Sequence, residues 1–81
     1  MSWFVYMLKC ADGSLYTGVA RDTGRRLEEH NSGKGAKYTR GRTPVRLVYT
    51  ERCLDQSRAV KRELAIKRMS RSRKLELARE R

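Results

Sequence analysis

The amino-acid sequence predicts an α+β fold, and three features of the chain carry that prediction. Residues 3–10 (WFVYMLKC) and 14–20 (SLYTGVA) are apolar runs of strand length, and the turn sequence ADG at 11–13 joins them into a hairpin. Residues 45–51 (VRLVYTE) predict a third strand, and helical patterns lie between and after the strands. A chain of 81 residues buries only about 60% of its unfolded surface, so we expect one small domain over residues 1–81.

Three helices are predicted from their start and stop signals. Gly33 ends the first helix, the second extends over residues 56–69, and the third follows to the C-terminus. Residues 34–44 (KGAKYTRGRTP) predict a basic loop that ends at Pro44, a residue that can begin a strand but cannot sit in its middle. The N-cap residues expected for the three helices are, in order, Asp22, Asp55, and either Ser70 or Ser72.

The length of the hairpin turn decides where two tyrosines point. With 11–13 as a three-residue loop and Gly13 in the left-handed region, Tyr6 and Tyr16 share one face of the sheet. A two-residue loop would put them on opposite faces. In the first case Gly18 lies across from Tyr6 and leaves a gap that a ligand could enter. Ordinary amphipathic packing of both rings is the alternative.

The first predicted helix carries two polar residues beside its apolar anchor. Arg26 and His30 stand four residues apart and flank the edge of Leu27. Burial of Leu27 therefore turns both polar groups toward the neighbouring element. The alternative is a solvated arginine that pairs with Glu28 or Glu29 on the same helix.

The second predicted helix places an acid and a base among its apolar residues. At 100° per residue, Glu63 and Lys67 fall within an arc formed by Ala59, Val60, Leu64 and Ile66. A charge in such an arc is costly unless it is paired or holds a metal. Glu63 could face a cleft and bind a hard divalent cation that keeps most of its waters. The alternative is a half-buried ion pair between Glu63 and Lys67.

The composition points to a polyanionic partner. The formal charge is +11, from 20 basic and 9 acidic side chains, which favours nucleic acid. No apolar run approaches the length of a membrane span, and no lipidation or signal sequence is present, so we expect a cytoplasmic protein without a membrane partner. Cys10 and Cys53 are too far apart for a paired metal motif, and we expect two reduced, packed thiols.

Together these residues resemble a known family. VYM is followed after ten residues by YTG, then by RRLEEH and by RELAIK on a later helix, and this ordered set resembles the GIY-YIG nuclease superfamily. It is most similar to the small single-domain bacterial branch (UPF0213-like), in which a loop resembling SGKGAKYTRGRTP follows the first helix. The resemblance implies a three-stranded antiparallel sheet flanked by helices, and hydrolysis of phosphodiester bonds with a single divalent metal, Mg²⁺ or Mn²⁺.

The resemblance also implies roles for individual residues. Tyr6 corresponds to the general base and Tyr16 to the second motif tyrosine. Arg26 corresponds to the residue on the scissile phosphate, His30 to a histidine of some relatives, and Glu63 to the metal ligand. No asparagine follows Glu63, although many relatives carry one there. The residues expected to bind nucleic acid are Lys34, Lys37, Tyr38, Arg40, Arg42 and Lys67.

The chemistry sets a condition on Tyr6. A tyrosine with its ordinary pKa near 10 is a poor base at neutral pH. It becomes an effective one if cations such as Lys9, Arg26 and the metal lower its pKa, or if a second group takes the proton onward.

We therefore expect a metal-dependent endonuclease that acts on structured or single-stranded DNA, with RNA as the second choice of substrate. A module that binds nucleic acid with little or no catalysis is the alternative, because the basic surface serves either activity. A third hypothesis is an interaction protein that docks on an acidic partner.

Overall fold

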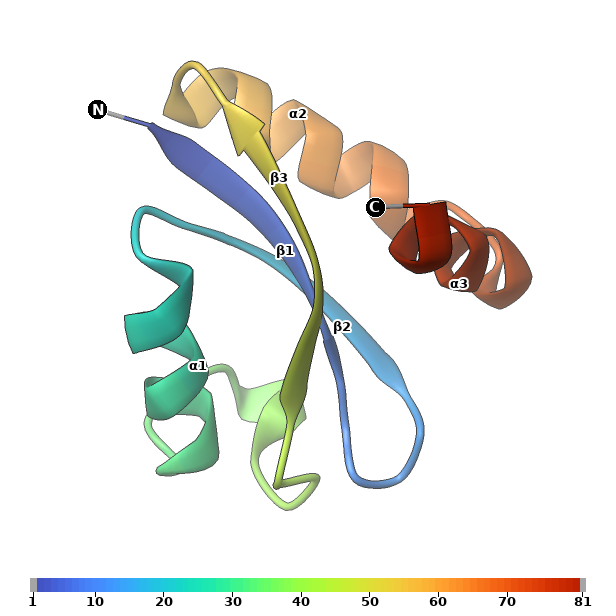
Figure 1. The fold of residues 1–81 in the computed structure, drawn as a ribbon. Helices are drawn as coiled ribbons and strands as arrows, with labels where there is room; N and C mark the ends of the chain where they lie inside the picture. Colours follow the sequence, from blue (N-terminus) through green and yellow to red (C-terminus); the bar gives the residue numbers. More distant parts are fainter. Residues whose placement is uncertain (1, 81) are drawn as a thin grey trace.

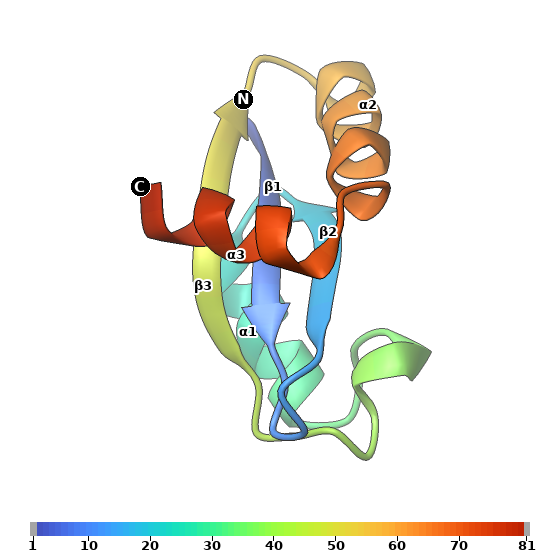
Figure 2. The same cartoon turned by 90° about the vertical axis from the view of Figure 1, so that its right-hand side faces the viewer.

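The computed structural model describes residues 2–80 and has the α+β architecture expected from the sequence (Figure 1). Three strands form one sheet, with α1 against one face and α2 and α3 against the other (Figures 1 and 2). In chain order the elements are β1 (Trp3–Lys9), β2 (Leu15–Ala20), α1 (Thr23–Asn31), the 3₁₀ helix η1 (Lys37–Thr39), β3 (Arg46–Cys53), α2 (Gln56–Lys67) and α3 (Arg71–Glu80).

The sheet has the strand order β2-β1-β3, and both pairings are antiparallel. The expected three-stranded antiparallel sheet is therefore confirmed. β1 lies in the centre because it is the most apolar strand, and its residues from 5 to 8 are all buried. The pairing of β1 with β3 is irregular between Met7 and Leu8, where β3 carries one extra residue.

The hairpin turn is the three-residue form. The Gly13 amide donates to the Cys10 carbonyl at 2.9 Å, and the Cys10 amide donates to the Ser14 carbonyl at 2.8 Å. Gly13 has φ +86°, a conformation that glycine adopts without steric cost. The resulting register pairs Leu8 with Tyr16 and Tyr6 with Gly18. Both tyrosines consequently lie on one face of the sheet.

Strand alternation divides the apolar residues into two clusters. The larger cluster lies under α2 and α3 and is built from Val5, Met7, Tyr49, Ala59, Ile66 and Leu77. The smaller cluster lies on the α1 face and consists of Tyr6, Leu8, Cys10 and Val45. One of the two tyrosines is thus a member of the smaller core, and the site described below is continuous with that core. Cys10 and Cys53 are free thiols, as expected.

The predicted helix caps are present. Asp22 accepts from the Arg25 amide at 3.0 Å, and Asp55 accepts from the Arg58 amide at 2.9 Å. Ser70, not Ser72, caps α3, because its hydroxyl accepts from the amide of residue 73 at 3.2 Å. The segment 34–44 was expected to be loop, but it contains η1, which the sequence signals missed.

The predicted apolar arc of α2 is wrong in one respect. Val60 and Leu64 are 37% and 50% exposed, whereas Ala59 and Ile66 are fully buried. The helix contacts the sheet through the narrower side that bears Ala59 and Ile66, and a polar contact also joins α2 to β3. Arg62 Nε donates to both carboxylate oxygens of Glu51 on β3, at 3.1 and 3.0 Å.

Within residues 2–80, none of the helices is both long and apolar enough to cross a membrane.

The turn geometry predicts the effect of replacing Gly13. Gly13→Ala should lower the free energy of unfolding by about 1–2 kcal/mol, because a Cβ is strained at positive φ. Gly13→Asn should lose less, since asparagine tolerates the left-handed region better. Urea unfolding followed by circular dichroism measures both changes. Equal stability of Gly13→Ala and the parent chain would contradict this account of the turn.

Candidate active site

Three aromatic rings meet on the α1 face of the sheet. Tyr6 comes from β1, Tyr16 from β2 and His30 from α1. The ring centroids are 6.4 Å apart for the two tyrosines, 6.0 Å for Tyr6 and His30, and 5.3 Å for Tyr16 and His30. Tyr6 and His30 are buried and Tyr16 is half-buried. The fold therefore brings Tyr6 and His30 together, although they lie 24 positions apart in the sequence.

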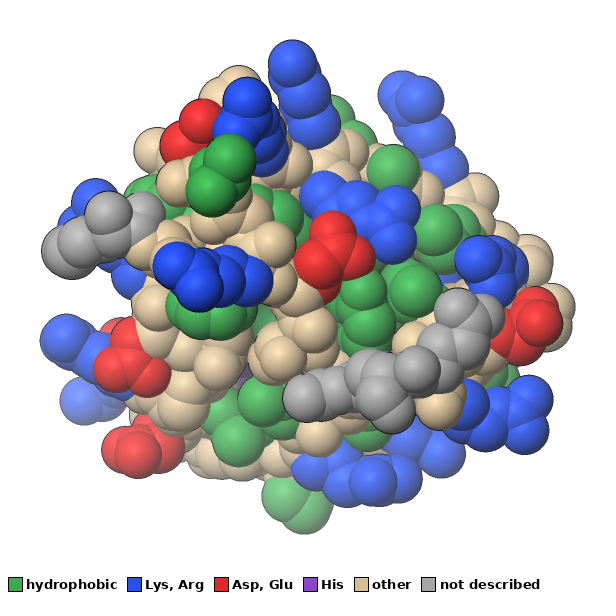
Figure 3. Space-filling view, turned by 45° about the horizontal axis from the view of Figure 1, so that its top comes forward, with side chains coloured by type: hydrophobic (Ala, Val, Ile, Leu, Met, Phe, Trp, Pro, Cys, Tyr) green, Lys and Arg blue, Asp and Glu red, His purple; other side chains and the backbone are tan. Residues whose placement is uncertain are grey.

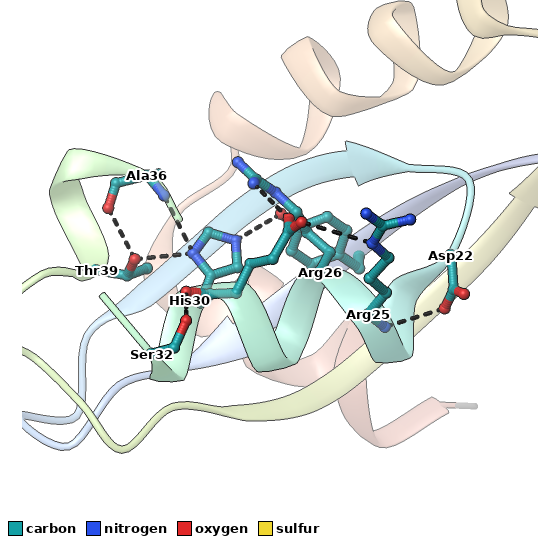
Figure 4. A network of polar contacts seen from close by, with 9 residues as sticks. Asp22, Arg25, Arg26, His30, Ser32, Ala36 and Thr39 are labelled. Carbon is teal, nitrogen blue, oxygen red and sulfur yellow. Dashed lines mark hydrogen bonds and ion pairs between the residues drawn. The ribbon is translucent and has the colours of Figure 1, made fainter. Parts of the chain in front are cut away.

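A chain of short hydrogen bonds runs through His30 (Figure 4). The Tyr6 hydroxyl lies 2.8 Å from Nε2, and Thr39 Oγ1 lies 2.8 Å from Nδ1. The Thr39 hydroxyl donates to the Ala36 carbonyl at 2.8 Å. All three contacts are satisfied when Tyr6 donates to Nε2 and the Nδ1 proton is donated to Thr39. The Ala36 amide, at 3.3 Å from Nδ1, is the longest contact of the group and competes with that arrangement.

Arg26 combines the two arrangements that the sequence left open, an ion pair on its own helix and a position beside the neighbouring strand. Its Nη1 donates to Glu29 Oε1 at 2.9 Å, as expected for a helix-surface pair. Its guanidinium also lies near enough to the Tyr6 phenol to oppose the rise in the Tyr6 pKa described below. Arg26 is one-third exposed, so its guanidinium borders solvent and Tyr6 at once. The carboxylate of Glu29 holds it in that position.

The environment raises the pKa of Tyr6 to about 12. Burial is the main cause, Arg26 opposes it, and the charges of Tyr16 and Glu63 add to it. Of the two conditions set on Tyr6, a pKa lowered by cations of the chain is therefore not met, because burial outweighs the lowering by Arg26. Strand alternation places Lys9 on the opposite face of β1.

The second condition set on Tyr6 is a neighbouring group that can take its proton onward, and His30 is such a group. Burial and the neighbouring Arg26 lower the pKa of His30, and Glu29 partly opposes them. The imidazole is thus neutral at pH 7, with Nε2 directed at the Tyr6 hydroxyl. A neutral imidazole can accept a proton from the phenol.

Glu63, on α2, acts on the same phenol through its charge. Its side chain is 16% exposed, and Oε2 lies 3.2 Å from Lys67 Nζ, so the expected i,i+4 ion pair is present. Glu63 also lies near enough to Tyr6 to raise the pKa of the phenol. Within residues 2–80, no three His, Cys, Asp or Glu side chains form a complete metal cage. A single carboxylate suits a cation that keeps several waters and also binds a phosphate, so Glu63 fits Mg²⁺ or Mn²⁺ in that mode.

Two glycines make room for the buried rings. A Cβ at Gly18 would lie 2.6 Å from the Tyr6 hydroxyl, so the gap expected beside Tyr6 is filled by its own phenol and not open to a ligand. A Cβ at Gly35 would collide with the His30 ring. No local sequence signal identifies Gly35 or Thr39 as neighbours of His30, because only the folded loop brings them there.

The basic loop, residues 34–44, lies over Tyr16 and is held there by contacts of Tyr38 and Arg42. Tyr38 stacks on Tyr16 with centroids 5.8 Å apart and an interplanar angle of 24°. The Arg42 guanidinium lies 4.2 Å from the Tyr38 ring centroid on a cation–π contact, and Arg42 Nε donates to Asp12 Oδ2 at 3.0 Å. The amide of Ala11 also donates to the Arg42 carbonyl at 2.8 Å. The loop therefore spans from the hairpin turn to the second tyrosine.

The residues expected to bind nucleic acid differ in their surroundings. Lys34, Lys37 and Arg40 are exposed on the loop, and Tyr38 is 40% exposed beside them. Arg42 is engaged with Asp12 and Tyr38, and Lys67 is engaged with Glu63. Lys and Arg side chains also project around much of the face shown in Figure 3, with acidic side chains between them.

A matched pair of glycine substitutions tests the packing of Tyr6. Gly18→Ala should lower the free energy of unfolding by about 1–3 kcal/mol, because the added methyl must displace the phenol from beside His30. Gly24→Ala is the control, since its Cβ meets only Asp22 Oδ1, at 3.6 Å, and alanine favours a helix. Chemical denaturation measures both. A Gly18→Ala chain as stable as Gly24→Ala would contradict the close contact.

His30 is the sole histidine of the sequence, so its ring protons can be titrated without ambiguity by NMR. We expect an apparent pKa below 6.5, because burial and Arg26 disfavour the charged ring. The unfolded chain then binds the proton more tightly than the folded one. The free energy of unfolding therefore falls as the pH drops below about 6.5. A measured pKa at or above 6.5 would contradict a buried neutral ring.

The chain matches the family described as the GIY-YIG catalytic domain over residues 2–76. The UPF0213 protein DP2720 of Desulfotalea psychrophila is 60% identical over 74 residues, which are 90% of this chain and 67% of that protein. A UPF0213 protein of Staphylococcus aureus is 56% identical over 80 residues, which are 99% of this chain and 98% of that protein.

Two solved structures are also similar. The solution NMR structure of the UPF0213 protein BH0048 from Bacillus halodurans matches with a TM-score of 0.64 and 47% identity, covering 100% of this chain and 86% of that one. The solution NMR structure of EF2693 from E. faecalis matches with a TM-score of 0.62 and 42% identity, covering 95% of this chain and 83% of that one. The ordered tyrosine, arginine, histidine and glutamate positions, the fold and these relatives agree that the chain belongs to the GIY-YIG family.

Proposed function

We propose that the protein is a metal-dependent endonuclease that hydrolyses phosphodiester bonds in DNA. The observation that carries the proposal is the Tyr6 hydroxyl, held 2.8 Å from His30 Nε2 with Arg26 and Glu63 acting on the same phenol. Membership of a family described by a catalytic domain supports it. The +11 charge and the exposed basic loop favour a polyanionic substrate.

In this mechanism Tyr6 removes a proton from the attacking water. With a pKa of about 12, the phenolate is scarce at neutral pH, so Tyr6 must lose its own proton in the same event. His30 Nε2 is positioned to receive that proton along the 2.8 Å hydrogen bond. The Nδ1 contact with Thr39 would then stabilise the imidazolium, as a hydrogen-bond acceptor behind a catalytic histidine does.

Charge on the phosphate is met by cations. Arg26 is one-third exposed near Tyr6, and it would hydrogen-bond the nonbridging oxygens of the scissile group, which gain negative charge in the transition state. Bound Mg²⁺ or Mn²⁺, held by Glu63, would supply Lewis-acid stabilisation of the same charge. Lys67 would remain beside Glu63 and contact the substrate backbone. Tyr16 would orient the phosphate from β2, steadied by the stack with Tyr38.

The alternative of a binding module with little catalysis draws support from one contact. Lys67 already neutralises Glu63 at 3.2 Å, and no asparagine follows Glu63 in the sequence. In that case the basic loop would bind nucleic acid while the buried rings act only as core. A substitution at Glu63 distinguishes the two functions, because catalysis requires this residue and binding does not.

A conservative exchange at Glu63 tests the proposal. Glu63→Gln should abolish cleavage of labelled single-stranded, duplex, flapped or branched DNA in Mg²⁺ or Mn²⁺, because it removes the charge that holds the cation. Affinity for the same DNA, measured by fluorescence anisotropy, should stay within about twofold of the parent chain, since the phosphate contacts remain. RNA substrates run alongside determine the preference for DNA.

The control is Glu28→Gln, which makes the same chemical change at an exposed position of α1. It should leave cleavage intact. Metal-dependent cleavage that survives Glu63→Gln would refute the assigned mechanism. Salt-sensitive binding by the parent chain with no products on any substrate would establish the binding module instead.

A further inference from the structure

A groove lies on the face of the sheet opposite the aromatic cluster. In Figure 2, α3 crosses this face and leaves the strand ends nearest the hairpin turn without a covering helix. The groove there has a volume of about 600 Å³, which is within the range of ligand pockets. Aliphatic side chains from two strands and α3 form its floor, namely Leu15, Val48, Leu75 and Ala78.

The described residues give the groove a cationic rim. Lys9, Arg46 and Arg79 line it, and none of the other described lining residues is Asp or Glu. Lys9 and Arg46 are direct cross-strand partners on β1 and β3, so two like charges face each other on one side of the sheet. Such a pair is destabilising, and none of the ion pairs among the described side chains involves either residue. An anion bound between them would remove that repulsion.

The groove continues past these two cations. A second hollow of about 360 Å³ is also lined by Lys9 and Arg46, and it extends along Cys10 and Ala11 to Pro44. The two hollows share both cations, so they are neighbours on the surface. A continuous apolar and basic surface of this shape suits an extended segment with alternating apolar and acidic side chains.

We propose that this groove docks an acidic amphipathic peptide segment of a partner protein. Apolar side chains of the segment would lie on the aliphatic floor, and its carboxylates would lie between Lys9, Arg46 and Arg79. Nucleic acid is the less suitable occupant, because unpaired bases stack on aromatic rings and the lining contains none. Since the groove and the aromatic cluster occupy opposite faces, a partner here leaves Tyr16 and the basic loop accessible.

The test titrates the ¹⁵N-labelled full chain with a short peptide of alternating leucine and glutamate, followed by backbone amide shifts. We expect shift changes at Lys9, Leu15, Val48 and Leu75. Two control peptides carry glutamine in place of glutamate or serine in place of leucine, and both should bind at least about tenfold more weakly. Oligothymidylate is titrated separately as the nucleic-acid probe.

Arg46→Glu is the decisive variant. It should weaken the peptide by about tenfold or more and yet yield a chain at least as thermally stable as the parent, because it replaces the Lys9–Arg46 repulsion with attraction. Arg58→Glu on α2 makes the same change in net charge outside the groove and should change affinity by less than about twofold.

Three results would overturn the proposal. One is that the peptide leaves the groove resonances unmoved. Another is that Arg58→Glu weakens binding as much as Arg46→Glu, which would show attraction to net charge alone. The third is that oligothymidylate shifts the same groove residues with equal or higher affinity, which would assign the groove to nucleic acid.

Discussion

The hydrogen bond between Tyr6 and His30 is the contact on which the rest of the site depends. Both side chains are buried, so neither can exchange this partner for water without opening the smaller core. The turn at Gly13 sets the face on which Tyr6 lies, and the bare backbones of Gly18 and Gly35 admit the two rings. Three glycines from separate parts of the sequence therefore contribute to the 2.8 Å hydrogen bond between Tyr6 and His30.

The parts of the site that could be predicted from sequence are those governed by local rules. Strand alternation puts Tyr6 and Tyr16 on one face once the turn has three residues, which is one of the two turn lengths that the sequence left open. The spacing of Arg26 and His30 on α1 put both beside Leu27, and His30 does lie against Tyr6. The helical pattern of α2 singled out Glu63, and the family resemblance added its role as metal ligand. Each inference needed only the conformation of a few consecutive residues, which the sequence encodes directly.

The remaining parts depend on contacts between distant segments. The pairing of Asp12 with Arg42 spans 30 positions, and Arg42 in turn lies against Tyr38, which stacks on Tyr16. Likewise, α2 packs on the sheet through Ala59 and Ile66 and leaves Val60 and Leu64 exposed, a choice that a helical wheel of α2 alone does not contain. The elevated pKa of Tyr6 belongs to the same class, because burial sets it and the residue type does not.

The burial of the sole histidine has a consequence for the outer surface. Histidine is the side-chain type whose ordinary pKa lies between about 6 and 7, and the one histidine of the sequence is buried. A change of charge on this imidazole therefore takes place inside the smaller core and not on the basic surface that faces a polyanion.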